Sequence, residues 1–178
     1  MDTVTIKDKS FEKYISKQKI EQTIKRLARE IEGEMKDKDP LFLVILNGAF
    51  MFASDLFKEM SMPCEISFAR LSSYKGTEST HKVKELIGVQ DEIKDRHVII
   101  VEDIIDTGIT LEHLQETLWK HNPASLRLAT MLFKPKAFKK DYPVHYIGMD
   151  ISNEFVVGYG LDYDGHGRNY ANIYKVIE

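Results

Sequence analysis

The residues best suited to chemistry lie in one short run, in which two adjacent carboxylates precede a small polar loop. Glu102 and Asp103 directly follow the apolar residues 98–101, and the loop Asp-Thr-Gly-Ile-Thr occupies residues 106–110. Backbone N–H groups at the start of a helix attract an anion and threonine hydroxyls donate further hydrogen bonds, so a phosphate group suits this loop. The acidic pair would repel a phosphate and suits hydroxyl groups or a hard cation such as Mg²⁺. Asp106 lies between these two zones and is placed like a general base.

The surrounding pattern predicts how this run is positioned. Residues 98–101 are apolar and β-branched, which is typical of a buried strand, and leucines follow at helical spacing over residues 111–118. In open α/β sheets, ligands bind at the carboxyl ends of the strands, which is where we expect the acidic pair. A ribose with a 5-phosphate carries all the groups that these residues suit. The alternative interpretation is a solvated loop in which Asp106 or Thr107 caps the helix.

The run resembles the phosphoribosyl pyrophosphate motif of the type I phosphoribosyltransferases. That motif consists of apolar residues, two acidic residues, two more apolar residues, Asp-Thr-Gly and a nearby Thr, and residues 98–110 meet every position. The resemblance implies that Glu102 and Asp103 hold the ribose hydroxyls and Mg²⁺, and that Asp106 is the catalytic residue. It also implies that the 5-phosphate is bound by the loop residues Thr107, Gly108, Ile109 and Thr110.

A second strand, turn and helix unit lies earlier in the chain. Residues 41–46 are apolar throughout, Asn47-Gly48 breaks the run, and residues 50–60 have a helical pattern. Asn-Gly is also a common hairpin signal, but a helix pattern follows it here. The region resembles the pyrophosphate-binding turn of the purine phosphoribosyltransferases, which implies pyrophosphate contacts at Asn47 and Gly48 and a cis peptide bond before Asn47. Members of that family often have Lys or Arg in place of Asn47, so this turn lacks one cation.

A polar, hydroxyl-rich segment at residues 72–80 follows a predicted strand at 64–71, and a returning strand is predicted at 82–89. Its composition is typical of a mobile loop, which is either an idle hairpin tip or a lid. Its Ser-Tyr pair resembles the flexible lid of the hypoxanthine-guanine enzymes. The resemblance implies that Ser73 and Tyr74 close over the reaction and exclude water.

Lys134 follows a further predicted strand, residues 125–133. From the residues alone, its amine is either solvated or donates to a carbonyl oxygen of a ligand. The purine phosphoribosyltransferases that this region resembles have a Lys at this place, which implies that Lys134 contacts the oxygen at position 6 of the base.

The segment Phe-Val-Val-Gly-Tyr-Gly-Leu-Asp-Tyr occupies residues 155–163. Its pattern alone allows a core strand as well as an aromatic platform for a base. It closely resembles the base-binding segment of the hypoxanthine phosphoribosyltransferases. The resemblance implies that the base stacks on Phe155, that Val156 reads its edge and that Asp162 contacts the base and Mg²⁺. It further implies that Arg168 holds pyrophosphate.

The whole pattern predicts an α/β protein with one domain over residues 1–178. A helix is expected at 16–35, with Ser16 as its cap and Gly33 near its end, and shorter strands are expected at 3–6, 144–149 and 172–177. The predicted architecture is the type I phosphoribosyltransferase fold, a mostly parallel twisted sheet flanked by helices. A small hood is expected from the N-terminal segment and about residues 140–178.

Composition excludes several classes of protein. The 178 residues are 43% hydrophobic and 30% charged, as in globular proteins, and the net charge of -3 gives no reason to expect nucleic-acid binding. Cys64 is the single cysteine, so neither a disulfide framework nor a thiolate metal site is expected. The sequence has no signal-peptide pattern and no apolar run of the ~20 residues that a membrane span needs. We therefore expect no membrane association and a cytoplasmic location.

The resemblances together imply purine salvage by Mg²⁺-dependent transfer of a phosphoribosyl group from phosphoribosyl pyrophosphate to N9 of hypoxanthine, and of guanine as well. The products would be IMP or GMP and pyrophosphate. The expected partners are phosphoribosyl pyrophosphate, the purine base and further copies of the chain in a homodimer or homotetramer. A xanthine-preferring transferase and a non-catalytic, nucleotide-sensing regulator of the same fold are the alternatives.

Overall fold

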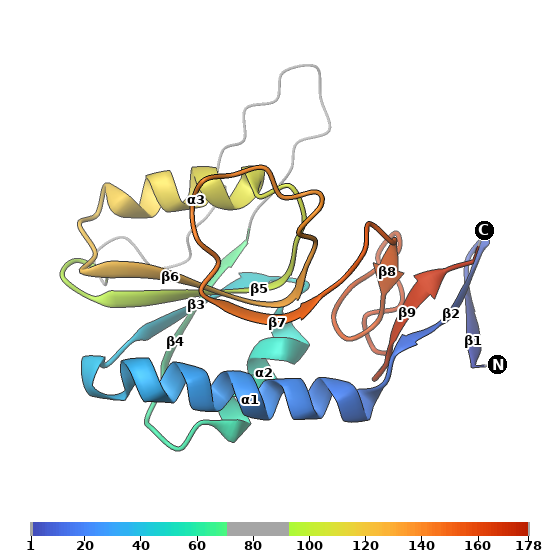
Figure 1. Cartoon of the computed structure of the whole chain (residues 1–178), viewed down its shortest axis with the longest axis horizontal. Coiled ribbons are helices and arrows are strands. Elements are labelled where there is room, and N and C mark those ends of the chain that lie inside the picture. Colours follow the sequence, from blue (N-terminus) through green and yellow to red (C-terminus); the bar gives the residue numbers. More distant parts are fainter. Residues whose placement is uncertain (1, 71–92, 178) are drawn as a thin grey trace.

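The computed structural model describes residues 2–70 and 93–177 (Figure 1). The helices and strands of these ranges are, in chain order, β1 (Thr3–Ile6), β2 (Lys9–Ile15), α1 (Lys17–Met35), the short 3₁₀ helix η1 (Lys36–Lys38), β3 (Leu41–Leu46), α2 (Phe50–Glu59), β4 (Glu65–Arg70), β5 (His97–Ile105), α3 (Ile109–Trp119), β6 (Ser125–Phe133), β7 (Tyr146–Asp150), β8 (Val156–Val157) and β9 (Ile173–Val176).

The larger of the two sheets has five parallel strands in the order β4-β3-β5-β6-β7. Helix α3 covers one face of this sheet, and α1 and α2 cover the other (Figure 1). This arrangement confirms the predicted parallel sheet flanked by helices. Strands β3 and β5 are neighbours, with Val44 paired to Val101, so the turns that follow them leave the same edge of the sheet.

Alternate residues of β3 pack on opposite faces of the sheet. Phe42 and Val44 are fully buried in the core shared with α1 and α2, whereas Leu41 and Leu43 are fully buried against α3. A strand that is buried on both faces has no solvated position. This burial explains why residues 41–46 form an uninterrupted apolar run.

Helix α1 confirms the predicted range 16–35, with Ser16 as its N-cap and Met35 as its last residue. The Ser16 hydroxyl caps it by accepting a hydrogen bond from the Lys19 backbone N–H at 3.2 Å. Gly33 does not end the helix, which continues to Met35. The buried side chains of Ile31 and Met35 hold the last turn on the core, and this packing outweighs the cost of about 1 kcal/mol for a glycine inside a helix.

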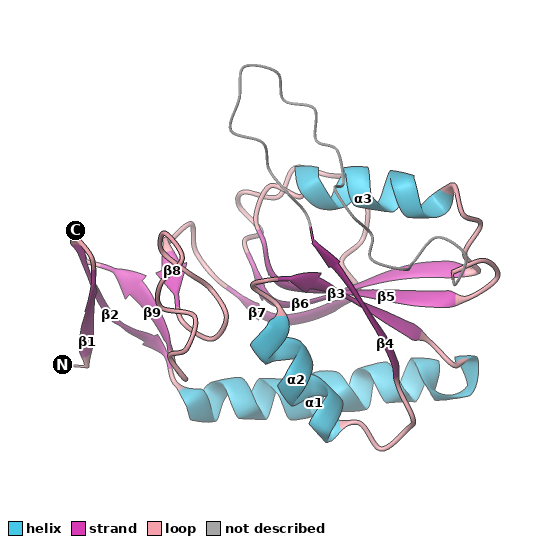
Figure 2. Cartoon of the chain, turned by 180° about the vertical axis from the view of Figure 1, so that it is seen from behind, coloured by secondary structure: helices cyan, strands magenta, loops and turns pink. Residues whose placement is uncertain are grey.

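The smaller sheet is antiparallel, has the strand order β1-β2-β9-β8 and joins the two ends of the chain (Figures 1 and 2). Its core includes Phe11, Val157 and Tyr174. Strand β2 is absent from the sequence prediction. Only its Phe11 and Ile15 are buried, and its position is set by pairing with β1 on one side and β9 on the other. The spacing of apolar residues along the sequence does not predict either pairing.

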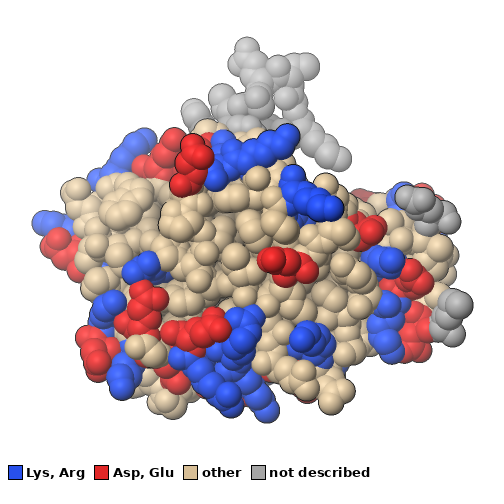
Figure 3. Space-filling view, viewed as in Figure 1, with Lys and Arg blue, Asp and Glu red and all other residues tan. Residues whose placement is uncertain are grey.

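The surface carries mixed charge. On the face seen in Figure 3, basic and acidic side chains are interspersed around large uncharged areas. Over the ranges 2–70 and 93–177, none of the helices combines the length and the apolar composition that crossing a bilayer requires.

Candidate active site

A cavity of about 330 Å³ opens at the sheet edge where β3 and β5 end. Several of the predicted site residues in its lining come from β5 and the loop after it, namely Glu102, Asp103, Asp106, Thr107, Gly108 and Thr110. Three more come from other parts of the chain, namely Gly48, Asp162 and Arg168. The fold therefore brings both predicted turns to one cavity, together with part of residues 155–170, which we call the late segment.

The acidic pair lies inside β5 and not after its end, which corrects the sequence prediction. Glu102 pairs with Thr130 and Ile104 pairs with Leu132 of β6, so the strand continues to Ile105. Burial raises the pKa of Asp103 to about 6 and raises the pKa of Glu102 well above its usual range, with the Asp103 charge adding to the effect on Glu102. Two carboxylates held in this way favour a bound cation.

The loop after β5 leads directly into α3. Its N-cap residue is Gly108, with φ +81°, and no side chain caps the helix. Asp106 and Thr107 therefore do not serve as the helix cap, and both are exposed at the cavity. The Ile109 N–H donates to the Thr107 hydroxyl oxygen over a long 3.5 Å, and the start of α3 faces the cavity as a site suited to an anion.

The segment after β6 supports this loop, a role that the sequence analysis missed. The Tyr142 hydroxyl donates to the Gly108 carbonyl at 2.6 Å, and the Phe138 ring packs edge-on against Tyr142. A Cβ on Gly108 would lie 2.6 Å from both aromatic side chains. Lys140 also pairs with Glu112 in the first turn of α3 at 2.6 Å. The only sequence signal is a pair of aromatic residues within a basic segment.

Lys134 and Asp106 contact each other directly. The Lys134 ammonium donates to an Asp106 carboxylate oxygen at 2.9 Å. The Lys134 side chain is 11% exposed and that of Asp106 is 50% exposed, so the pair lies at the boundary between core and solvent. Lys134 is therefore not a solvated lysine. The predicted catalytic residue and the lysine predicted to contact the purine base are therefore in direct contact.

The turn after β3 packs against the acidic pair. The Leu46–Asn47 peptide bond is cis, as the resemblance implies. A Cβ on Gly48 would lie 1.6 Å from an Asp103 carboxylate oxygen, so only glycine fits at this position. The Asn47 side chain is exposed and does not line the cavity.

Asp162 and Arg168 form an ion pair in the lining of the cavity. Arg168 Nη2 lies 2.7 Å from Asp162 Oδ1, and Arg168 Nη1 donates to the Gly160 carbonyl at 2.6 Å. The other Asp162 oxygen accepts a hydrogen bond from the Gly165 N–H at 2.7 Å. The guanidinium is thus held in place before any anion binds.

Phe155 and Val156 lie outside the cavity lining, as does Ile109. Phe155 is 46% exposed and its ring packs against Phe11 and Tyr163. Val156 is buried in β8. The roles predicted for these residues stay predictions. The predicted lid residues Ser73 and Tyr74 lie outside the described residues.

Oxygen atoms make the cavity suitable for a hard cation. The carboxylates of Glu102, Asp103 and Asp162 all line it, and Mg²⁺ takes one or two carboxylates while keeping several waters. Among residues 2–70 and 93–177, no group of three or more His, Cys, Asp or Glu side chains converges on a single point. The carboxylates therefore fit a partly hydrated ion better than an ion enclosed by protein ligands.

Comparisons with known proteins agree with this geometry. Residues 10–164 match the family model described as the phosphoribosyl transferase domain. The chain is 41% identical to the hypoxanthine phosphoribosyltransferase of Haemophilus influenzae, over 92% of this chain and 93% of the relative. It is 40% identical to the hypoxanthine-guanine phosphoribosyltransferase of Lactococcus lactis, over 94% and 93% of the two chains. The crystal structure of a Staphylococcus aureus hypoxanthine phosphoribosyltransferase superposes with a TM-score of 0.86 at 36% identity, covering 93% of this chain and 91% of that one.

Proposed function

Because this chain belongs to the phosphoribosyltransferase family, we propose that it is a purine salvage enzyme that transfers a phosphoribosyl group from phosphoribosyl pyrophosphate to N9 of hypoxanthine and guanine. The products are IMP or GMP and pyrophosphate. The reaction needs a site for a 5-phosphate, a site for pyrophosphate, and groups that hold a 6-oxopurine between them.

The observation that carries this proposal is the contact between Lys134 and Asp106 beside the loop 106–110. An ammonium donor and a carboxylate acceptor match the oxygen at position 6 and the N7 position of a 6-oxopurine. A base that reaches them takes over both partners of the ion pair. Lys134 then donates to the oxygen, and Asp106 faces N7 and helps to remove the proton of the base as N9 attacks C1 of the ribose.

The remaining residues divide the other tasks. The loop Thr107–Thr110 anchors the 5-phosphate at the start of α3. Glu102 and Asp103 hold the ribose hydroxyls. The Gly48 turn and Arg168 receive the departing pyrophosphate, and Phe155 and Val156 hold the base. Glu102, Asp103 and Asp162 would hold Mg²⁺, which would supply positive charge to offset that of the pyrophosphate.

The proposal also includes the domain organisation, the lid, the cellular location and the oligomeric state of the enzyme. Both sheets work as one domain over residues 1–178. The hood consists of the N-terminal segment and the residues after β7, because β7, which lies in the range 140–178 expected for the hood, is a strand of the larger sheet. Ser73 and Tyr74 belong to the lid. The enzyme acts in the cytoplasm as a homodimer or homotetramer.

The test is the ultraviolet spectral change when the purified chain is mixed with Mg²⁺, phosphoribosyl pyrophosphate and one base. We expect conversion of hypoxanthine and guanine that stops when EDTA is added. A strong preference for xanthine would replace the proposed substrates. Binding of phosphoribosyl pyrophosphate with no conversion of any base would favour the nucleotide-sensing regulator.

The role of Asp106 has its own test. Asp106→Asn should lower kcat by about 10²–10⁴-fold, the range expected for a lost general base, with phosphoribosyl pyrophosphate binding nearly unchanged. The control is Asp37→Asn, which alters an exposed carboxylate in η1. Unchanged turnover in Asp106→Asn would remove Asp106 from the mechanism.

A further inference from the structure

We propose that Tyr159 is a positioning residue for the pyrophosphate site. Its hydroxyl, bound to Asp55 of α2, holds the segment that carries Gly160 and Arg168 against the turn that carries Gly48. This inference rests on the proposed function, because it assumes that Gly48 and Arg168 receive pyrophosphate.

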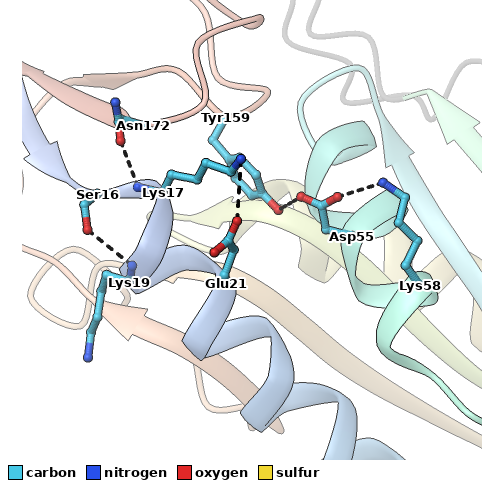
Figure 4. Close-up of polar contacts among 8 residues, drawn as sticks. All are labelled: Ser16, Lys17, Lys19, Glu21, Asp55, Lys58, Tyr159 and Asn172. Carbon is cyan, nitrogen blue, oxygen red and sulfur yellow. Dashed lines mark hydrogen bonds and ion pairs between the residues drawn. The ribbon is translucent and has the colours of Figure 1, made fainter.

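The Tyr159 side chain reaches from the late segment to α2. It is 4% exposed, and its hydroxyl lies 2.8 Å from an Asp55 carboxylate oxygen (Figure 4). The same hydroxyl lies 3.5 Å from the Met51 carbonyl. The second Asp55 oxygen accepts from Lys58 at 3.0 Å, which orients the carboxylate. Burial and the neighbouring Asp55 raise the pKa of the Tyr159 phenol, so the hydroxyl remains a donor.

The backbone at this point needs an anchor. Tyr159 has φ +50°, which side chains other than glycine rarely adopt, and it lies between Gly158 and Gly160, which also have positive φ. Such a conformation persists only where the surrounding structure holds it in place. The Tyr159 N–H donates to the Tyr170 carbonyl at 2.8 Å, and the hydroxyl bond to Asp55 is the second anchor.

The residue after Tyr159 contacts both parts of the pyrophosphate site. The Gly160 carbonyl accepts from the Arg168 guanidinium at 2.6 Å. Its Cα packs so closely on the Gly48 turn that an added Cβ would lie 2.0 Å from the Gly48 carbonyl oxygen. A shift of residue 159 would therefore move Arg168 relative to Gly48.

Removal of the hydroxyl should change this geometry more than it changes stability. Tyr159 and Asp55 also line a second cavity, of about 530 Å³, between α1 and α2. The Asp55 side chain is 39% exposed, so water can replace the lost donor and no buried charge is left unpaired. The phenylalanine ring would keep the apolar packing.

The test compares Tyr159→Phe with a matched control. Tyr146→Phe removes the hydroxyl of a tyrosine that is also 4% exposed, and this hydroxyl bonds to Glu34 at 2.7 Å outside the lining of the active-site cavity. For Tyr159→Phe we expect KM for phosphoribosyl pyrophosphate, and for pyrophosphate in the reverse reaction, to rise about 5-fold, the effect of one lost hydrogen bond. KM for hypoxanthine should stay within about twofold. Tyr146→Phe should lower Tm and leave every KM unchanged.

The partner residue gives a second arm. Asp55→Leu should reproduce the effect of Tyr159→Phe, and the double variant should be no worse than either single variant. Asp55→Asn keeps an acceptor oxygen and should retain the wild-type KM. A KM increase shared equally by hypoxanthine, or unchanged KM values in an active Tyr159→Phe enzyme, would overturn the inference alone. A wild-type chain without transferase activity would overturn both the inference and the proposed function.

Discussion

The two halves of the catalytic cavity are built in different ways. The phosphate half, residues 102–112, is one continuous strand, loop and helix. The assembled half consists of Gly48, Asp162 and Arg168, which come from segments that are distant in the sequence. The phosphate half owes its shape mainly to local chain geometry. The assembled half exists only because the late segment packs against the β3 turn, so it should be more sensitive to packing changes.

The largest effect is expected where the two halves touch. Gly48→Ala would place a Cβ 1.6 Å from Asp103 Oδ2 and force the turn away from the acidic pair. A displacement of about 1 Å at a reacting centre can cost about 100-fold in rate, so kcat/KM should fall at least that far. Steady-state kinetics measures the loss. Activity within tenfold of wild type would show that the assembled half tolerates displacement.

Asp103→Asn should separate stability from function. The folded-state pKa of Asp103 is about 6 against a usual 3.8, so the carboxyl costs no stability below pH 3.8 and destabilises the fold progressively as pH rises to about 6. Without Mg²⁺, at pH 7.5, the variant should be more stable by at most about 3 kcal/mol, at 1.36 kcal/mol for each pKa unit. Urea unfolding in EDTA from pH 4 to pH 7.5 tests this.

In that experiment, the stability gain of Asp103→Asn should grow over this pH window, while turnover with Mg²⁺ falls. An equal stability difference at both ends of the window would contradict the assigned burial of the Asp103 charge.

Tyr142→Phe tests the support of the phosphate half by a residue that does not line the cavity. Loss of the 2.6 Å bond to the Gly108 carbonyl should raise KM for phosphoribosyl pyrophosphate about 5-fold and leave pyrophosphate binding in the reverse reaction within about twofold. This split distinguishes Tyr142→Phe from Tyr159→Phe, for which both constants are expected to rise. Identical behaviour of the two variants would mean that the halves are not independent.

The smallest effect is expected far from both halves. Within the described part of the chain, no atom lies within 4 Å of a Cβ added to Gly33, which is inside α1. Gly33→Ala should therefore raise the free energy of unfolding by about 0.5–1 kcal/mol without changing kcat or KM. Urea unfolding measures the gain, and the variant serves as the matched control for Gly48→Ala.

Residue types along the chain specified the phosphate half almost completely. The apolar run, the acidic pair and the loop 106–110 are contiguous, so their periodicity and turn chemistry predicted β5, α3 and the loop that lines the cavity between them. Three of the predicted ranges, for β1, β3 and β6, match the strand bounds. The error lies at one boundary, because pairing with β6 extends β5 past Asp103, whereas the predicted end of α1 at residue 35 is confirmed.

Only the tertiary structure decided which distant side chains meet. The Lys134–Asp106 ion pair, the Tyr142 bond to Gly108 and the Tyr159 bond to Asp55 each join segments that are far apart in sequence. Strand β2 likewise depends on partners at both ends of the chain. Local patterns reflect the conformation of a few neighbouring residues. Contacts between distant segments follow from the packing of whole elements, which brings the assembled half of the cavity together.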